Sequence, residues 1–306
     1  MIGASGMVRP RLALVLGASG MVGSAIMRLL RRYGIAIIGT GFRHLSGPLV
    51  SLDLRDKPTG IAFLKSWRPD WIFFPAAWSY VDGCERDPEM SRSINVEPLS
   101  WLLPALRSYG GKLLFFSSEY VFSGNGGPYR EQDAPFPLSV YGLHKVEAEQ
   151  QIALLSPEAL VVRTTWVYGP DAYRKNFVHQ IIDVSRQGRG VDVPMDQVST
   201  PTYVEDLAIA AVRLMSTDET GMWHVAGPER MTRLAWAHAV CEHFGIDRDL
   251  IRPVRTEELG RPAARPLKAG LVSTKLIQRA GIRPRDLDSG LRSIKGQEAY
   301  DKWQST

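Results

Sequence analysis

Short apolar runs alternate with longer amphipathic stretches along the first half of the chain. Residues 12–16 are all apolar and are followed by apolar residues at helical spacing through Leu30, which predicts a buried strand and then a helix. Similar runs predict strands at 35–38, 50–54, 71–74, 112–116 and 160–163. Helical patterns cover 90–106, 141–155, 177–186, 205–215 and 234–244. Strands and helices that alternate in this way are typical of a doubly wound, parallel α/β sheet.

The alternation weakens after Arg163, where prolines, arginines and short mixed elements become frequent. We therefore expect a loose tail at 1–10, a first domain with the alternating pattern at 11–165 and a smaller lobe at 166–306. Elements around 203–226 are expected to pack back on the first domain. The predicted fold class is α/β, with one doubly wound parallel sheet and a smaller C-terminal lobe.

Three glycines at the spacing GxxGxxG, Gly17, Gly20 and Gly23, join the first predicted strand to its helix. They permit a tight turn, close approach of a pyrophosphate to the backbone, and close packing of the helix on the sheet. The same hexapeptide, GASGMV, occurs at 3–8, but no apolar run precedes it, so that copy is expected to belong to the tail. A plain tight turn is the alternative for the second copy. The expected phosphate contacts are Gly17, Ser19, Gly20, Met21 and Val22.

The end of the second predicted strand bears on the choice of cofactor. An acidic residue there would hold the ribose 2′-hydroxyl of NAD, but this chain has Arg43 and His44. A guanidinium pairs well with a 2′-phosphate, so the sequence favours NADP(H), with NAD(H) and a solvated loop arginine as alternatives. Asp53 and Leu54 end the next strand, where Asp53 either accepts from the adenine amino group or caps a turn. After the fourth strand, Ala76 and Ala77 either admit the cofactor ribose or simply pack tightly.

Tyr141 and Lys145 lie four residues apart on a predicted helix and therefore share one face. A neighbouring ammonium lowers the pKa of a phenol, so Lys145 is expected to lower that of Tyr141 and to hold the nicotinamide ribose. Tyr141 would then act as a general acid toward a carbonyl. Ser118, at the end of a predicted strand, would hydrogen-bond and orient that carbonyl. A surface helix with an ordinary tyrosine and lysine is the alternative.

Composition narrows the class of protein. The chain has 306 residues, 44% hydrophobic residues and a formal net charge of +5, and it contains no apolar run of about 20 residues and no signal-peptide pattern. We therefore expect neither a membrane nor an exported location. Two cysteines, Cys84 and Cys241, suit a reducing cytoplasm. The basic residues are largely dispersed, which argues against nucleic acid as a partner.

Other clusters of polar or aromatic residues are weaker candidates. Asp82, Glu85, Asp87 and Glu89 are expected to form a solvated face. The second half contains His238, Cys241 and His243 without supporting carboxylates, so no metal site is expected. Some aromatic residues after strand ends are expected either to stack on a base or sugar or to pack: Trp78, Tyr80, Tyr120, Trp166 and Tyr168.

Four motifs occur in the order GASGMVG, SSEYVFSG, YGLHK and RTTWVYG. Together they resemble the extended short-chain dehydrogenase/reductase family, including dTDP-4-dehydrorhamnose reductases and the regulatory β subunit of methionine adenosyltransferase. The resemblance implies a Rossmann-type NAD(P)-binding domain, a C-terminal substrate-binding lobe, and NADPH-dependent reduction of a 4-keto-6-deoxy sugar nucleotide. It places the catalytic serine, tyrosine and lysine at Ser118, Tyr141 and Lys145. The expected substrate contacts are Trp78, Ser118, Glu119, Tyr120, Trp166, Asn176, Gln197 and Arg265.

The resemblance leaves alternatives open. The reductases usually have Thr-Asp where this chain has Ser118-Glu119, which keeps the hydroxyl but changes its neighbour. The segment GTGFRH is closer to the methionine adenosyltransferase β subunit, which favours a cofactor-binding regulatory subunit as one alternative. A sugar-nucleotide epimerase on the same fold is another. A homodimer is compatible with each of these functions.

Overall fold

A computed structural model describes residues 9–42, 45 and 47–304, with side chains described through 296. The first copy of the hexapeptide, at 3–8, and the predicted cofactor residues Arg43 and His44 lie outside the described residues.

Seven parallel strands form the central sheet of the described chain, in the order β11-β6-β5-β4-β1-β2-β3. The doubly wound α/β fold predicted from the sequence is confirmed. Chain order reverses where β1 pairs with both β2 and β4, and at such a point the carboxyl ends of the strands open a crevice for ligands. The strands are β1 (Ala13–Val15), β2 (Ile37–Gly41), β3 (Leu49–Ser51), β4 (Trp71–Phe74), β5 (Lys112–Ser118), β6 (Leu160–Thr164) and β11 (Gly221–His224).

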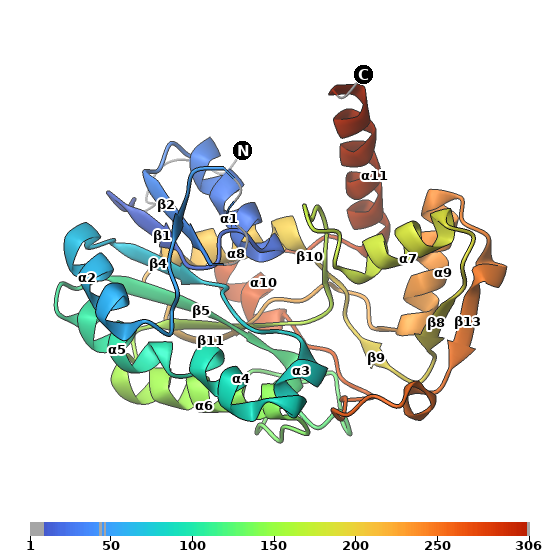
Figure 1. The fold of residues 1–306 in the computed structure, drawn as a ribbon, viewed down its shortest axis with the longest axis horizontal. Helices are drawn as coiled ribbons and strands as arrows, with labels where there is room; N and C mark the ends of the chain where they lie inside the picture. The colour runs from blue at the N-terminus through green and yellow to red at the C-terminus, as the bar shows by residue number, and fades with distance from the viewer. Residues whose placement is uncertain (1–8, 43–44, 46, 305–306) are drawn as a thin grey trace.

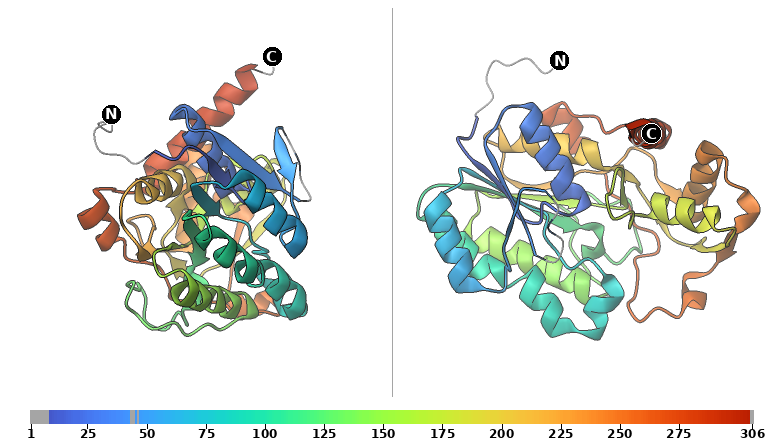
Figure 2. Two further views of the ribbon diagram at one scale, coloured as in Figure 1. Left: turned by 90° about the vertical axis from the view of Figure 1, so that its left-hand side faces the viewer. Right: turned by 45° about the horizontal axis from the view of Figure 1, so that its top comes forward.

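Helices cover both faces of this sheet (Figures 1 and 2). Ala13 and Val15 of β1 pack into the core on one face, and Leu14 packs into the core on the other, which explains why the strand sequence is apolar throughout. One face carries α1 (Met21–Arg32), α8 (Val204–Met215) and α10 (Thr274–Ala280); the other carries α2 (Lys57–Trp67), α4 (Pro88–Asn95), α5 (Pro98–Arg107) and α6 (Val140–Leu155). The short α3 (Val81–Arg86) and η1 (Glu119–Val121) follow β4 and β5.

A smaller lobe lies beyond the carboxyl ends of the strands (Figure 1). Its core gathers around Trp236, Tyr168 and Ile181. The lobe contains α7 (Phe177–Arg186), α9 (Arg233–Phe244), α11 (Leu287–Gln304), η2 (Arg248–Leu250), η3 (Thr256–Leu259) and the paired strands β8 (Val191–Pro194) and β13 (Ile251–Val254). Two further short pairs connect the lobes: β7 (Val167–Tyr168) with β10 (Thr202–Tyr203), and β9 (Val198–Ser199) with β12 (Met231–Thr232).

The structure corrects one predicted helix. Residues 90–106 belong to two helices, α4 and α5, separated at Val96 and Glu97. Pro98 has no N–H to donate into a preceding turn, so it begins a new helix instead of continuing the old one. Across the described residues, we find no helix with the length and apolar character needed to cross a membrane.

Candidate active site

The glycine turn brings the backbone close to the end of β4. Gly17 has a φ of +84°, and a Cβ added there would lie 2.8 Å from the Cα of Ala76. At Gly23, an added Cβ would overlap the carbonyl oxygen of Gly17. The turn is fixed to β2 by a hydrogen bond of 2.7 Å from the Ala18 N–H to the Thr40 carbonyl. The first and third glycines therefore have the steric roles predicted from the sequence.

A groove of about 370 Å³ lies over this turn, at the carboxyl ends of β1, β2 and β4. Among its lining residues are eight that the sequence selected: Gly17, Ser19, Gly20, Asp53, Leu54, Ala76, Ala77 and Trp78. Met21 and Val22 begin α1 directly after the turn. The sequence analysis did not select Phe42, Arg55 or Lys175, which also line the groove.

Arg55 is the partner of Asp53 in the groove. Its guanidinium donates to both carboxylate oxygens of Asp53, with distances of 2.6 to 3.1 Å, and lies 5.4 Å from the centre of the Phe42 ring. Asp53 also accepts from the Arg55 backbone N–H at 3.0 Å, so it caps the turn as one of the two predicted alternatives required, and its ion pair with Arg55 forms a charged wall of the groove. The only hint of this ion pair in the sequence is the position of the arginine, two residues after the aspartate.

Helix α6 places Tyr141 and Lys145 on its buried face. Ser139 caps the helix by accepting from the Gly142 N–H. The Lys145 Nζ donates to the Phe116 carbonyl at 2.9 Å and lies 5.8 Å from the centre of the Tyr141 ring. Ser118 ends the neighbouring strand β5, and its hydroxyl lies near enough to Tyr141 to lower the pKa of that phenol. The three predicted catalytic side chains therefore meet beside the end of β5.

The protonation of this group differs from the expectation that Lys145 lowers the pKa of Tyr141. Burial raises the pKa of Tyr141 well above its ordinary value, and the nearby Ser118 hydroxyl opposes this only in part. Burial also lowers the pKa of Lys145 to about 8. The ammonium is directed at a backbone carbonyl, and burial is the largest influence on the pKa of each group.

Gly142 sets the contact between α6 and η1. A Cβ at this position would overlap the carbonyl oxygen of Tyr120, which is backbone and cannot move away cheaply. We expect Gly142→Ala to lower the free energy of unfolding by about 1–3 kcal/mol, the usual cost of overpacking, in urea denaturation. Gly296→Ala is the matched control: it is also helical, an added Cβ meets nothing within 4 Å, and it should stabilise by about 0.5–1 kcal/mol. Equal effects of the two substitutions would contradict the close approach.

A buried polar chain that the sequence analysis missed fixes the loop after β4 against α6. The His144 Nδ1 lies 2.8 Å from the Ser91 Oγ, and Asn95 donates to that same Oγ. Asn95 also accepts from the Trp78 N–H at 2.9 Å. This chain connects Trp78, which lines the groove, to His144, the neighbour of Lys145 on α6.

Glu119 occupies a different position from the predicted substrate contact. It is 2% exposed, and its carboxylate accepts hydrogen bonds from the Ser199 hydroxyl and from the Gly270 N–H. Burial raises the pKa of this carboxyl group. Glu119 therefore ties the end of β5 to the smaller lobe and does not present its charge to the cleft.

The Arg265 side chain is also paired within the protein. It donates two hydrogen bonds of 2.7 Å to the two carboxylate oxygens of Asp82, and both residues are buried. The pairing with Arg265 holds the pKa of Asp82 below its ordinary value. Asp82, expected on a solvated face, is thus half of an ion pair, while Asp87 caps α4 and Glu85 accepts from the Val140 N–H.

The remaining predicted substrate residues surround the boundary between the lobes. Asn176 caps α7 and its amide lies 3.6 Å from the sulfur of Met21 in α1. Gln197 donates to the Thr256 hydroxyl at 3.1 Å. The Tyr120 ring meets the Tyr141 ring edge-on with their centres 5.7 Å apart. Trp166 has a φ of +40° and stacks on Trp236.

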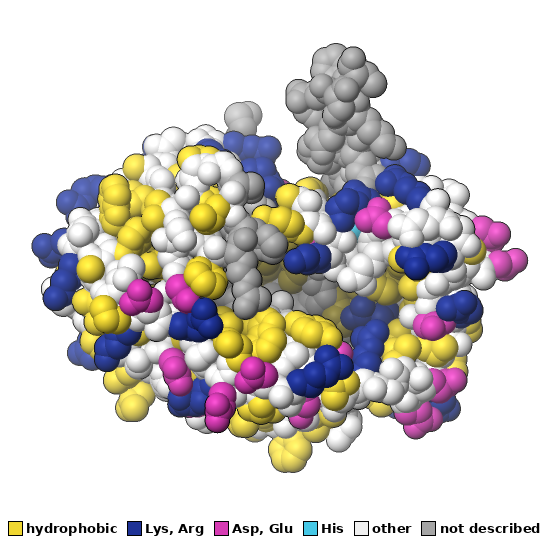
Figure 3. All heavy atoms as spheres, in the orientation of Figure 1, with side chains coloured by type: hydrophobic (Ala, Val, Ile, Leu, Met, Phe, Trp, Pro, Cys, Tyr) yellow, Lys and Arg dark blue, Asp and Glu magenta, His cyan; other side chains and the backbone are white. Residues whose placement is uncertain are grey.

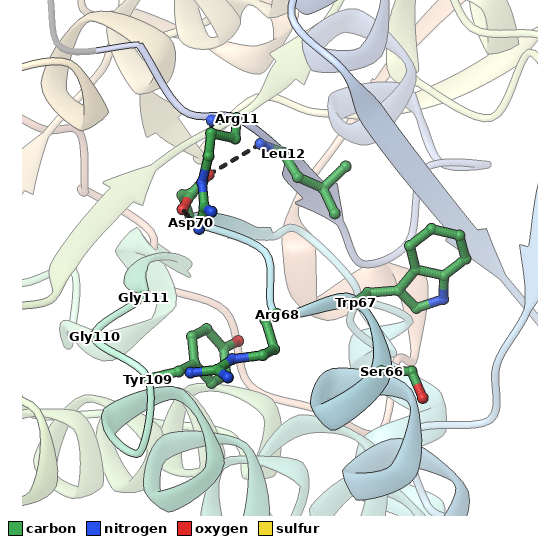
Figure 4. Close-up of a pocket in the computed structure, with 9 residues that line it drawn as sticks. All are labelled: Arg11, Leu12, Ser66, Trp67, Arg68, Asp70, Tyr109, Gly110 and Gly111. Atoms are coloured by element: carbon green, nitrogen blue, oxygen red, sulfur yellow. Dashed lines mark hydrogen bonds and ion pairs between the residues drawn. The ribbon is translucent and has the colours of Figure 1, made fainter.

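A second hollow, of about 490 Å³, lies at the opposite edge of the sheet, where β1, β4 and β5 begin (Figure 4). Arg11 and Asp70 form an ion pair of 3.0 Å there, and Arg68 lies against the Tyr109 ring. The buried Tyr109 hydroxyl has no hydrogen-bond partner among the described residues. The hollow shares no lining residue with the groove, so it supplies control positions for mutagenesis.

The structure also describes the histidine and cysteine side chains that the sequence offered as weak metal-ligand candidates. His243 is bonded to Asp288 at 2.8 Å, and Cys241 is buried in the core of the smaller lobe. Within the part of the chain that the structure describes, no group of three or more His, Cys, Asp or Glu side chains could hold a metal ion.

Comparison with known proteins places this site in context. The family model of the RmlD substrate binding domain matches residues 11–298. The chain is 35% identical to a dTDP-4-dehydrorhamnose reductase of Streptomyces griseus, over 90% of each chain. It is 28% identical to methionine adenosyltransferase 2 subunit beta of Xenopus laevis, over 98% of this chain and 92% of that one. A crystal structure of dTDP-4-dehydrorhamnose reductase from Bacillus anthracis in complex with NADP is 26% identical, with a TM-score of 0.86 and coverage of 95% and 100%.

Proposed function

Because the chain belongs to the RmlD substrate binding domain family, we propose that it reduces the ketone of a 4-keto-6-deoxy sugar nucleotide with NADPH. One observation carries the proposal: Ser118, Tyr141 and Lys145 meet at the end of β5, two strands from the glycine turn on β1. A family relative is a dTDP-4-dehydrorhamnose reductase, and one similar structure holds NADP.

The residues present fit a dinucleotide. The backbone at Gly17 leaves no space for a side chain, as a pyrophosphate cradle requires. The N-terminus of α1, with its unpaired N–H groups, follows directly and favours an anion. Lys175, from the smaller lobe, adds a cation to the groove. We assign Arg43 and His44 to the 2′-phosphate on the sequence alone.

Each catalytic side chain has a separate task in this mechanism. Bound NADPH supplies a hydride for the ketone carbon. Tyr141 donates its phenolic proton to the ketone oxygen, and its raised pKa keeps that proton in place at neutral pH. The Ser118 hydroxyl donates a hydrogen bond to the same oxygen as negative charge develops. Lys145, held by the Phe116 carbonyl, orients the nicotinamide ribose.

The pKa of Lys145 predicts a pH dependence. If the ammonium form is needed, kcat/KM for NADPH falls as the pH rises through about 8, by about tenfold for each further pH unit. The stability of the fold depends on pH in the opposite direction. Between pH 8 and 10.5 the unfolded chain binds more protons at this lysine than the folded chain does, so the free energy of unfolding rises with pH in that window. Steady-state kinetics of the wild type and of Lys145→Arg check this, because arginine stays charged and should remove the alkaline decline. An identical decline in both proteins would contradict it.

We further propose that residues 11–165 bind the cofactor and that 166–306 bind the sugar nucleotide. Two contacts of the 203–226 segment support a shared interface: β11 pairs with β6, and α8 packs on the same face of the sheet as α1. We also propose that the protein is a cytoplasmic homodimer. The free thiols of Cys84 and Cys241 agree with a reducing compartment. Light scattering on the purified protein tests the dimer.

The test of the activity is a panel of keto sugar nucleotides incubated with the protein and NADPH. Loss of NADPH absorbance with a 4-keto-6-deoxy compound is the expected result. The similarity to methionine adenosyltransferase 2 subunit beta over nearly the whole chain favours a second candidate, a regulatory subunit. That candidate would bind NADP and co-purify with a methionine adenosyltransferase while leaving every compound of the panel unreduced. An epimerase would convert its substrate without net consumption of NADPH.

A further inference from the structure

Arg233 is a half-buried cation that the mechanism above does not use. It is the first residue of α9, and its guanidinium lies 4.3 Å from the centre of the Trp166 ring and 4.7 Å from that of Phe177. Its Nε is buried and has no hydrogen-bond partner among the described residues. The aromatic faces stabilise the positive charge, but they accept none of its five N–H groups in ordinary hydrogen bonds.

A guanidinium Nε that is buried without a hydrogen-bond acceptor is unfavourable unless a ligand supplies one. Burial lowers the pKa of Arg233 to about 10, so the side chain remains a cation at neutral pH. A buried donor without a partner is destabilising, because it has given up its hydrogen bonds to water. The neighbouring carboxylate of Glu119 is bonded to Ser199 and Gly270 and gives Arg233 no hydrogen bond within the described structure.

Besides the Glu119 carboxylate, two further arginines act near Arg233, next to the catalytic group. Arg233, Arg261 and Arg265 all act electrostatically on the Tyr120 hydroxyl, and the Tyr120 ring is 5.7 Å from that of Tyr141. Arg265 is neutralised by Asp82, whereas Arg261 is exposed. Figure 3 shows Lys and Arg side chains (dark blue) in the hollow between the two lobes.

The backbone at this place is strained. Trp166, whose ring supports Arg233, has a φ of +40°. Non-glycine residues with such a backbone conformation are strained and cluster at active sites and ligand sites. An unpaired guanidinium, a second arginine and a strained tryptophan thus occur together at the substrate side of the catalytic tyrosine.

We propose that Arg233 binds the diphosphate of a nucleoside-diphosphate substrate, with Arg261 adding positive charge at the entrance. The inference rests on the proposed function for the class of substrate, but not on turnover. Arg265, which the sequence analysis expected to contact the substrate, has its guanidinium already paired with Asp82. Because charge-assisted hydrogen bonds are worth about 1.5–3 kcal/mol, loss of Arg233 should weaken binding of a diphosphate by about ten- to a hundredfold.

Calorimetry on the full chain loaded with NADPH tests this without any reaction. dTDP, UDP and GDP are titrated, and the one that binds best is compared with its monophosphate. The wild type should prefer the diphosphate, Arg233→Gln should lose most of that preference, and Arg233→Lys should keep part of it. Arg248→Gln removes an exposed charge of the same lobe and should change nothing. Unaltered NADPH affinity of each variant reports an intact fold.

A ratio of diphosphate to monophosphate affinity separates a charge contact from a merely structural role, which would weaken both ligands equally. An unchanged ratio in Arg233→Gln, or a wild type that prefers no diphosphate, would overturn the inference. Turnover separates it from the proposed function. A wild type that binds a diphosphate through Arg233 but oxidises no NADPH contradicts the reductase alone, whereas a normal KM in Arg233→Gln contradicts the inference alone.

Discussion

Tyr141→Phe lowers kcat for ketone reduction by about 10²–10⁴-fold, the usual contribution of a positioned proton donor, and leaves NADPH affinity nearly unchanged. The substitution removes one oxygen and keeps the ring that packs against Tyr120. The Tyr141 phenol is buried, and its raised pKa makes it the group that holds a transferable proton at neutral pH. Steady-state kinetics and NADPH titration measure the two effects separately.

Tyr109→Phe is the matched control for this experiment. It deletes a hydroxyl that is also buried and has no partner among the described residues, but at the opposite edge of the sheet. Its kcat should equal that of the wild type. Turnover by Tyr141→Phe within a few fold of the wild type would remove the proposed acid from the mechanism.

Gly17→Val abolishes measurable cofactor binding while the sheet still folds. Valine is strained at a φ of +84°, and its Cβ would lie 2.8 Å from the backbone of Ala76. The turn must shift, and the N–H groups that face the phosphates shift with it. Two lost hydrogen bonds to a charged group, at about 1.5–3 kcal/mol each, correspond to a loss of at least about a hundredfold in NADPH affinity.

Gly34→Ala is the control that distinguishes a damaged cofactor site from the backbone strain that any side chain causes at a positive φ. Gly34 also has a positive φ, of +66°, but an added Cβ there meets nothing within 4 Å. This variant should lose some stability and bind NADPH normally. Fluorescence titration of both variants, with thermal unfolding as the check on folding, measures the difference. Normal NADPH affinity in Gly17→Val would show that the cofactor does not lie on this turn.

The sheet could be predicted because its strands are covered on both faces. Residues 71–74 are all apolar and form β4 with the same bounds, since a parallel strand between two helical layers exposes no polar side. Tyr141 and Lys145 could be paired because both are on one helix, where a spacing of four residues fixes a shared face. Local rules were sufficient for both features.

The contacts between the lobes could not be predicted in the same way. Glu119 meets Gly270 across 151 residues, and Asp82 meets Arg265 across 183. No local pattern distinguishes a carboxylate that will be buried by such a partner from one that faces a substrate. Arg233 was missed for the related reason that two of the rings around it, Trp166 and Phe177, lie far from it in the sequence.

Transfer of deuterium from NADPH labelled at the reactive position of its nicotinamide tests the reductase assignment most directly. With a 4-keto-6-deoxy sugar nucleotide as substrate, the expected product carries deuterium at C4 of the sugar, one atom for each NADPH oxidised. An unlabelled sugar, with the NADPH still reduced and bound, would contradict hydride transfer at this site.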